Sequence, residues 1–466
     1  MTMPDHTKRP PAVQAGSRQI AAELIETLRL AAPMALTQLS QIAMMTTDLA
    51  FIGRLGDDAI AAAALAGTIY FVSFTFGMGP MSAVAPLVAQ TYGAGDPARM
   101  RQALHAGLWA GLVVALPIMM FPLRGEAILL VLGQASEPAR LAQEYLLGLA
   151  WGIAPALWFM ALRSFMGAVN RPAPVLWITL AAIPVNALLV YPLLYGAWGL
   201  PMLGMFGAGL ATSLVNLGSF LAALWFATYR PPFRDYHVLA RLWRIDRSLM
   251  RQVVVIGAPI SLAFLLEYGL FSTASLLMGL IGAAALAAHQ IALQVAAILY
   301  MVPYGISMAA TVRVGHAAGR NDVAGIRRAG LTAIWVAIAI AAALTAAVVV
   351  ARFAIARFFL GQGAAESEAV AALAATLLVV GATLFVTDAL QTVASGALRG
   401  VKDTRIPLLY AVIGYWLIGF PASYALGFHT SLGPVGIWIG LSTGTAAYAT
   451  LLVLRFLRLS SPSVTA

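Results

Sequence analysis

The sequence contains no cysteine and little charge. Without cysteine, disulfides, iron–sulfur clusters and thiol catalysis are excluded, although the cellular compartment stays undetermined. Only 10% of the 466 residues are Asp, Glu, Lys or Arg, compared with about 25% in soluble domains. The mean hydropathy is +0.87, and no stretch is both long and polar enough to fold separately in water. These features predict an all-α polytopic membrane protein, because helices satisfy their own backbone hydrogen bonds inside a bilayer.

Motifs for nucleotide hydrolysis and for a diphosphate site are also missing. The sequence has no GxxxxGK[ST] phosphate loop, so this chain is not expected to hydrolyse ATP. Asp57 and Asp58 are adjacent in a predicted loop, but no second acidic cluster is present to complete a metal site for a diphosphate. We therefore expect a protein that is not an enzyme and that needs no cofactor.

Twelve apolar segments are long enough to cross a bilayer, which takes about 17–25 residues. We place these spans at residues 30–53, 60–90, 103–123, 141–162, 173–195, 205–228, 252–278, 284–312, 329–351, 370–398, 406–428 and 434–454. Residues 1–19 are polar and contain three prolines. They are predicted to form a disordered cytoplasmic tail and not a secretory signal peptide.

The basic residues are distributed unevenly between the two sides that these spans define. One side, which carries both termini, receives 23 of the 28 Lys and Arg residues, Arg163 and Arg399 among them, and the other side receives 5. The first side is therefore cytoplasmic by the positive-inside rule. The net charge of +10 thus sets membrane topology and does not indicate nucleic-acid binding. We expect a multi-pass protein of the cytoplasmic (inner) membrane.

The chain divides near its middle, at a polar stretch from Arg230 to Gln252. An internal repeat with a constant offset relates the two parts: Ala32-Pro33, Gly53 and Gly56 correspond to Ala258-Pro259, Gly279 and Gly282. We expect an N-lobe of six spans at residues 20–228, a cytoplasmic linker at 229–251, a C-lobe of six spans at 252–458 and a cytoplasmic tail at 459–466. Since six is even, the lobes are parallel repeats, an arrangement typical of transporters that alternate access around a midplane site.

Two further echoes support the repeat less strongly. The segment from Gly167 to Pro174 resembles that from Gly400 to Pro407. The second echo pairs Gly95 and Ala106-Gly107-Leu108 with Gly319 and Ala329-Gly330-Leu331, with one residue of slippage. This second echo could also be coincidence in a chain rich in Gly and Ala.

Three carboxylates interrupt the otherwise apolar spans, namely those of Asp48, Glu267 and Asp388. Each placement costs about 2.5–3.5 kcal/mol near the bilayer centre on insertion scales. Asp48 shares a polar helical stripe with Gln41, seven residues earlier. Such a stripe faces the bundle interior or a water-filled cavity and not lipid. These carboxylates are therefore predicted to mark where the protein binds a cation, a proton or both.

Asp388 lies on a polar helical face with Gln391, Thr392 and Ser395, at spacings of three, four and seven. The hydroxyl side chains alone would indicate contacts between helices, but a carboxylate on the same face favours a functional role.

Glu267 differs because its neighbours Phe264, Leu265 and Phe271 are apolar. Such surroundings disfavour a charged carboxylate, which suits a proton carrier. Alternatively, Na⁺ could be held at Glu267 and Asp388 by carboxylate, hydroxyl and carbonyl oxygens, the ligands that hard cations prefer. A third alternative is a structural glutamate that stays protonated.

The residues around these positions resemble a family, the multidrug and toxic compound extrusion transporters, and specifically their NorM-type bacterial branch. The resemblance covers about Leu28 to Leu457. Its longest matching segments are AAPMALTQLSQIAMMTTDLAFIGRLG in the first half, and IGAPISLAFLLEYGLFSTASLLMG and DALQTVASGALRGVKDTRIP in the second. It implies a fold of twelve helices in two six-helix lobes around a V-shaped central cavity.

The resemblance also implies roles for individual residues. Asp48 and Asn186 match an aspartate and an asparagine that lie close together in the N-lobe of family members, an N-lobe site for a proton or substrate. Glu267 and Asp388 match an acidic pair that takes part in cation coupling. Leu384, one turn before Asp388, replaces a tyrosine found near the cation site in some relatives, which leaves Na⁺ and H⁺ as alternatives.

The resemblance and the acidic sites together predict a monomeric antiporter. It would export amphipathic, often cationic, organic compounds from the cell in exchange for Na⁺ or H⁺, with membrane lipid as its other partner. Two alternatives are a flippase for lipid-linked precursors and a membrane-embedded transferase. A flippase of this superfamily usually carries basic residues in its cavity, whereas the charges inside these spans are acidic, which favours a cationic cargo. A transferase needs paired acidic motifs or a nucleophile at the membrane boundary, and the sequence shows neither.

Overall fold

The computed structural model describes residues 12–244, 246–360 and 365–461 and is helical along almost its whole length. The first half comprises α1 (Ala12–Ile52), α2 (Asp57–Gly93), α3 (Pro97–Met120), α4 (Gly125–Val131), α5 (Ser136–Ala150), α6 (Ile153–Ala168), α7 (Ala173–Tyr195) and α8 (Gly204–Tyr229). The second half comprises α9 (Arg247–Ile281), α10 (Ala283–Gly319), α11 (Val323–Leu360), α12 (Ala365–Gly400), α13 (Arg405–Ala411), α14 (Phe420–Phe428) and α15 (Pro434–Leu459). Short 3₁₀ turns lie at Gly53–Leu55, Pro122–Arg124 and Phe233–Tyr236.

The predicted twelve spans all fall on these helices, which confirms the fold class. In the described residues, ten helical segments are long and apolar enough to cross a membrane, and the pair α5 and α6, bent by 49°, makes an eleventh. The helix α1 is the twelfth and is long enough, but Gln38, Gln41 and Asp48 make it less apolar than the others. It starts at Ala12, inside the segment predicted as a tail, and contains Pro33. Residues 1–11 lie outside the described residues.

The predicted span at residues 406–428 is not a regular helix. Residues Val412–Gly419, between α13 and α14, form a π-helical segment. Pro421 follows it and has no N–H to donate to the carbonyl of Leu417, which loosens the α-helical ladder at this point. The segment carries Tyr415, whose side chain is buried. This local departure from α-helix fixes where the Tyr415 phenol lies.

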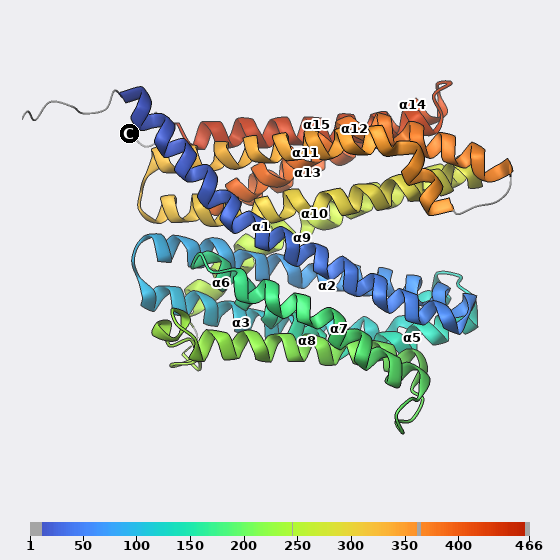
Figure 1. Cartoon of the computed structure of the whole chain (residues 1–466), viewed down its shortest axis with the longest axis horizontal. Coiled ribbons are helices and arrows are strands. Elements are labelled where there is room, and N and C mark those ends of the chain that lie inside the picture. Colours follow the sequence, from blue (N-terminus) through green and yellow to red (C-terminus); the bar gives the residue numbers. More distant parts are fainter. Residues whose placement is uncertain (1–11, 245, 361–364, 462–466) are drawn as a thin grey trace, which may run out of the picture.

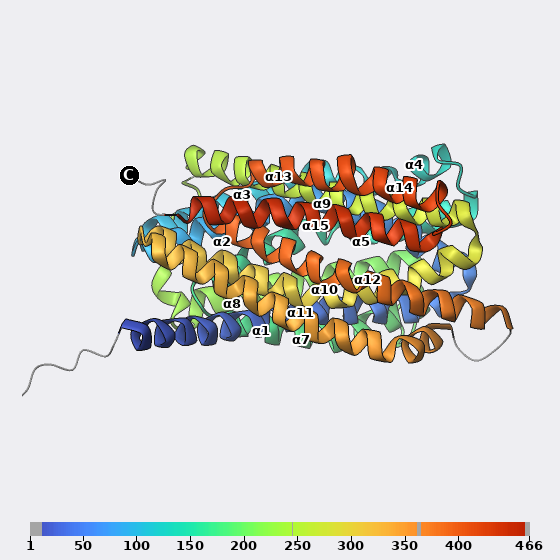
Figure 2. The ribbon, with the colours of Figure 1, turned by 90° about the horizontal axis from the view of Figure 1, so that it is seen from above.

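The two halves form two layers that α1 connects (Figure 1). The helices α10 to α15 lie in the upper layer and α2 to α8 in the lower, while α1 runs diagonally from one to the other. It packs against α10 in the second half and against α7 in the first. The helix α9 shows the reciprocal arrangement, since it packs against α2 and α3 as well as α13. Figure 2, turned by 90°, shows the long helices running roughly side by side.

The backbone of the connecting turns supports the repeat. Gly56 precedes α2 with φ 110° and Gly282 precedes α10 with φ 155°, a region that L-residues rarely enter. Gly95 and Asn321, which are related by the same offset, both have positive φ after those helices. The sequence echo that pairs Gly95 with Gly319 is therefore out of register, because at this offset Gly319 corresponds to Gly93.

The other echo is displaced by one residue. Asn170 and Lys402 are the residues with positive φ in the turns after α6 and α12, so these turns align Asn170 with Lys402. The sequence comparison instead aligns Gly167 with Gly400, which pairs Asn170 with Asp403. Turn conformation, and not residue identity, gives the structural correspondence here.

Small residues bring the two halves into close contact. A Cβ atom added to Gly79 of α2 would lie 2.2 Å from the carbonyl oxygen of Gly257 of α9, and one added to Gly319 of α10 would lie 2.0 Å from the carbonyl oxygen of Gln90. Glycines of this kind let membrane helices approach closely. Beside these contacts, Gln90 donates a hydrogen bond to the carbonyl oxygen of Gly400 (2.8 Å).

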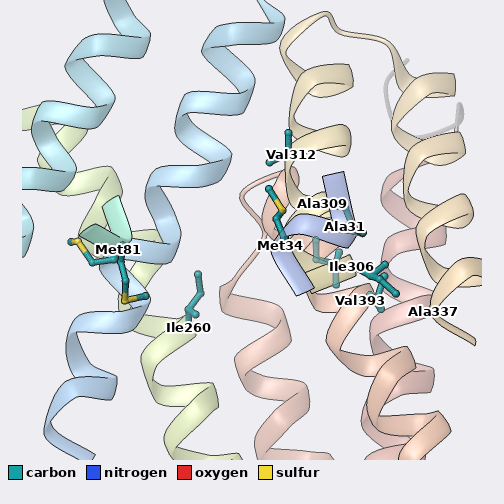
Figure 3. Close-up of a cluster of buried hydrophobic side chains, with 14 of the residues drawn as sticks. Ala31, Met34, Met81, Ile260, Ile306, Ala309, Val312, Ala337 and Val393 are labelled. Carbon is teal, nitrogen blue, oxygen red and sulfur yellow. The ribbon is translucent and has the colours of Figure 1, made fainter. Parts of the chain in front are cut away.

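One buried apolar cluster runs through both halves. Figure 3 shows part of it, in which Met81 of α2 and Ile260 of α9 belong to different halves. Met34 of α1 lies in the same cluster as Ile306 and Val312 of α10. The helices α1 and α9 therefore join the halves by side-chain packing.

Two side chains that the sequence places in cytoplasmic loops lie instead within helices. Arg163 is in α6 and Arg399 in α12, and both are buried, with exposed fractions of 7% and 8%. The predicted spans end at residues 162 and 398, each directly before the charged residue. In the structure both helices continue past the arginine, to Ala168 and Gly400.

Candidate cation site

Glu267 and Asp388 come together in the second half, on α9 and α12. The Nε2 atom of Gln391 donates to Asp388 Oδ1 at 2.6 Å and to Glu267 Oε1 at 3.2 Å. The two carboxylate oxygens therefore both lie within hydrogen-bond distance of a single nitrogen atom. Gln391 lies three residues after Asp388, about one helical turn, so both side chains project from the same side of α12.

The pair is surrounded by phenol groups. Tyr300 of α10 lines a cavity with Glu267 and another with Asp388. Tyr415 lies in the first of these cavities, and its hydroxyl is buried without a hydrogen-bond partner among the described residues. The amide oxygen of Gln391 is also buried and unpartnered there. Such groups are costly when unsatisfied, and both have lone pairs that a cation or a water molecule can use.

The polar face predicted on α12 lines the cavity of Glu267. Gln391, Thr392 and Ser395 all contribute to its wall, as their spacing from Asp388 predicts. Leu384, where some relatives have a tyrosine, is buried in the apolar core. Tyr300 and Tyr415 supply the phenols near the carboxylates instead. Sequence reasoning missed both, since an isolated tyrosine in an apolar span gives no signal of its own.

Asp48 has a different environment, in the first half. Asn186 Nδ2 of α7 donates to Asp48 Oδ1, so the structure brings together the two residues that the resemblance pairs. Thr212 of α8 donates from Oγ1 to Asp48 Oδ2 at 3.1 Å. Each carboxylate oxygen thus has its own neutral donor, and the Asp48 side chain is only 6% exposed. The sequence alone does not single out Thr212, because hydroxyl residues are common in membrane helices and most of them have no functional role.

Gln41 does not join this cluster. It is partly exposed on α1, two helical turns before Asp48, and within the described part of the chain it forms no side-chain hydrogen bond with Asp48, Asn186 or Thr212. The periodicity that places Gln41 and Asp48 on one stripe is correct, but seven residues correspond to about 10 Å along a helix. Gln41 stays a prediction for the N-lobe site.

Within the described residues, no group of three or more His, Asp or Glu side chains is arranged as a metal-binding cluster. The arrangement at Glu267 and Asp388 instead offers two carboxylates, an amide oxygen and phenols. Oxygen ligands of this kind suit a proton or a hard monovalent cation. A partly buried acidic pair inside long apolar helices, beside a cavity, defines the class: a multi-pass membrane protein with an acidic site within its helix bundle.

Comparison with known proteins places the chain in a family. It matches the MatE family model over residues 33–192 and 259–425. It is 63% identical over 458 residues to the "Probable multidrug resistance protein NorM" of Bradyrhizobium diazoefficiens, covering 98% of each chain. It is 38% identical over 441 residues to the "Multidrug resistance protein NorM" of Burkholderia vietnamiensis, covering 94% of each. The chain belongs to the MatE family, the multidrug and toxic compound extrusion transporters, and is therefore not an enzyme.

The fold agrees with this assignment. The solved structure described as the eukaryotic MATE transporter AtDTX14 superposes with a TM-score of 0.82 at 22% identity, over 95% of this chain and 98% of that one. At such low identity the likeness concerns the fold alone.

Proposed function

We propose that this protein is a secondary active multidrug efflux transporter that exchanges amphipathic, often cationic, organic compounds for inward Na⁺ or H⁺ by alternating access. The observation that carries the proposal is the acidic pair of Glu267 and Asp388, bridged by one amide nitrogen inside the membrane. The names of the relatives, which describe multidrug resistance proteins, support the class of substrate.

The acidic pair supplies a reason for coupling. Two ionised carboxylates that share one nitrogen atom, at 2.6 Å and 3.2 Å from it, repel each other strongly where water is scarce. A proton or Na⁺ relieves that repulsion, so the lobe with the cation bound differs in energy from the lobe without it. Antiport needs only that the cation and the exported compound favour states that compete with each other.

Asp48, Asn186 and Thr212 form the second site of the proposal, for a proton or for substrate. Because neutral donors hold both oxygens of Asp48, the site can hold one charge without a cation. We propose that it assists transport and that the acidic pair drives it.

The remaining parts of the proposal concern arrangement. We propose that residues 20–228 and 252–458 act as two lobes, with residues 229–251 as a cytoplasmic linker. We propose that the protein acts as a monomer. We also propose that it lies in the cytoplasmic membrane with both termini inside, and the bias of 23 of 28 basic residues supports this orientation.

The test is efflux of a cationic dye from proteoliposomes under separately imposed Na⁺ and pH gradients. The proposal predicts that at least one gradient drives efflux and that Glu267→Gln and Asp388→Asn abolish it. Each variant is matched for amount inserted and for a monodisperse profile in detergent. Efflux that needs neither gradient would contradict the proposal.

One observation favours the flippase alternative. Arg163 and Arg399 both line a cavity between the halves, together with Met34, Tyr304 and Thr311, and guanidinium groups bind phosphates well. Movement of a fluorescent lipid diphosphate across the proteoliposome membrane, lost in Arg163→Gln, would establish this function in place of cation export.

A further inference from the structure

A cavity lined by Glu267 of the acidic pair extends toward the side of the protein that carries most basic residues. Glu267 lines it at one end, and Asp403 and Thr404, in the turn after α12, line it at the other. Its volume is about 40 Å³, and a cavity needs about 10–15 Å³ on this measure to hold one water molecule. The cavity therefore has room for about three water molecules.

All residues that line this cavity belong to the second half of the chain. They come from α9, α10, α12, the turn after α12, α13, the π-helical segment and α15. The route thus lies inside one six-helix unit and not in the space between the two halves. A cation using it would reach the cytoplasmic side without passing through the cavity that Arg163 lines.

Arg399 lies along this route, between Ser395 and Asp403 in sequence, and its side chain is part of the wall. It is 8% exposed, and in the described segments no carboxylate forms an ion pair with it. Its Nη2 atom donates to Ser307 Oγ at 3.1 Å, and its Nε atom lies 3.4 Å from the carbonyl oxygen of Ser395. Asp403, an acidic residue of the same wall, is instead paired with Arg455 at 2.8 Å.

A buried, fixed positive charge is a barrier to cations, since it repels them where the dielectric constant is low. Arg399 also lines the cavity between the halves, so its position depends on how the halves pack. A change in that packing can move the guanidinium group away from the route.

We propose that this cavity is the route by which the coupling cation passes from Glu267 and Asp388 to the cytoplasm, and that Arg399 is the barrier that closes it. The inference rests on the proposed cation coupling. It assigns Arg399 a positioning role and no direct contact with the exported compound.

The first test measures cation leak in proteoliposomes without any exported compound, with ²²Na⁺ uptake and a pH-sensitive dye. Arg399→Gln is expected to raise the uptake of the coupling cation about 10-fold, while Arg399→Lys, which keeps the charge, stays close to the parent protein. Adding Glu267→Gln to Arg399→Gln is expected to remove the leak, because the cation then lacks its binding site. Arg163→Gln is the matched control, a buried arginine outside this cavity, and should not leak.

The outcomes separate the route from the proposed function. A parent protein with no cation-driven efflux would overturn both. If efflux is cation-driven but a correctly inserted Arg399→Gln variant shows no cation leak, only the role of Arg399 as a barrier is overturned. A leak that survives Glu267→Gln, or that is equal in Arg163→Gln, would also overturn it.

The second test uses the absence of cysteine in the sequence, which allows single cysteines without removing others. Ser395→Cys lies on the route, and Ala394→Cys, at the same depth, is packed in the core with 0% exposure. Silver ion, a small cation that reacts with thiols, is added from the cytoplasmic side. Ser395→Cys is expected to react at least 10-fold faster than Ala394→Cys, and faster again with Arg399→Gln. Equal rates, with Thr404→Cys reacting at the mouth, would overturn the route.

Discussion

The acidic sites of the two halves differ in how their charge is held. In the first half, Asp48 has one hydrogen-bond donor for each oxygen. In the second half, Glu267 and Asp388 share a single amide nitrogen. Asp48 thus has two neutral donors for one carboxylate, whereas the second half has one donor for two carboxylates, which would repel each other if both were ionised. The comparison shows that the two halves have related helices but different acidic sites, and that only the second half has more carboxylates than bridging donors.

The repeat makes this asymmetry explicit. At the offset that relates Pro33 to Pro259, Asp48 corresponds to Ala274 and Glu267 corresponds to Gln41. Ala274 is buried in the apolar core, and Gln41 is partly exposed. Neither acidic site is therefore a symmetry copy of the other, and substitutions in the two halves should have different consequences.

The largest effect is expected from the acidic pair. Glu267→Gln or Asp388→Asn removes one of the two charges, so a cation no longer gains from relieving their repulsion. Cation-driven efflux in proteoliposomes should fall more than about 10-fold, equivalent to about 1.4 kcal/mol of lost coupling. Retention of normal efflux by both variants would remove the basis for the comparison.

Gln391→Leu is expected to have the next largest effect. It deletes the bridge between the carboxylates, and hydrogen bonds to charged groups are worth about 1.5–3 kcal/mol. The cation concentration that half-saturates efflux should change several-fold. Thr376→Val is the control on the same helix, because Thr376 is exposed and bonds only to the carbonyl oxygen of Ala372. An unchanged half-saturation in Gln391→Leu would show that the bridge does not organise the site.

Asp48→Asn is expected to lower efflux less than either change in the acidic pair. The amide can still bond to Asn186 and Thr212, and the site loses a charge that its neutral partners already held. Efflux should fall by roughly 2- to 5-fold with the same cation dependence as the parent protein. Complete loss of cation dependence would mean that the two sites are equivalent, contrary to the comparison.

The smallest effect is expected from Thr212→Val. It removes one hydrogen bond to Asp48 of 3.1 Å, worth about 1 kcal/mol in the free energy of unfolding. The thermal midpoint in detergent should fall slightly and efflux should stay within about 2-fold of the parent protein. Thr46→Val, on the exposed side of α1, should leave the midpoint unchanged, and an equal drop in both variants would argue against a specific bond at Thr212.

Much of the fold could be predicted from the sequence, because apolar length and the distribution of basic residues depend only on the bilayer. The twelve spans and their order follow from these two properties. The ends of α6 and α12 could not be predicted, since buried Arg163 and Arg399 look like loop residues until their surroundings are known. The π-helical segment at Val412–Gly419 likewise depends on neighbouring helices and has no clear pattern.

The candidate site could be predicted in part. An acidic residue in an apolar span is conspicuous, so Asp48, Glu267 and Asp388 are evident, and helical spacing adds Gln391, Thr392 and Ser395. Partners from other helices are not evident, because nothing local in the sequence links Thr212 to Asp48 or Tyr415 to Glu267. Those links depend on the packing of helices far apart in the chain, as does the cavity that joins Glu267 to Asp403.

The most direct test of the central claim is to record cation flux driven by substrate in proteoliposomes. An outward gradient of a cationic dye is imposed, and uptake of Na⁺ or H⁺ is measured with no cation gradient. The account predicts uptake in the parent protein and in Asp48→Asn, and no uptake in Glu267→Gln, with all three matched in amount. Uptake by Glu267→Gln equal to that of the parent protein would contradict it.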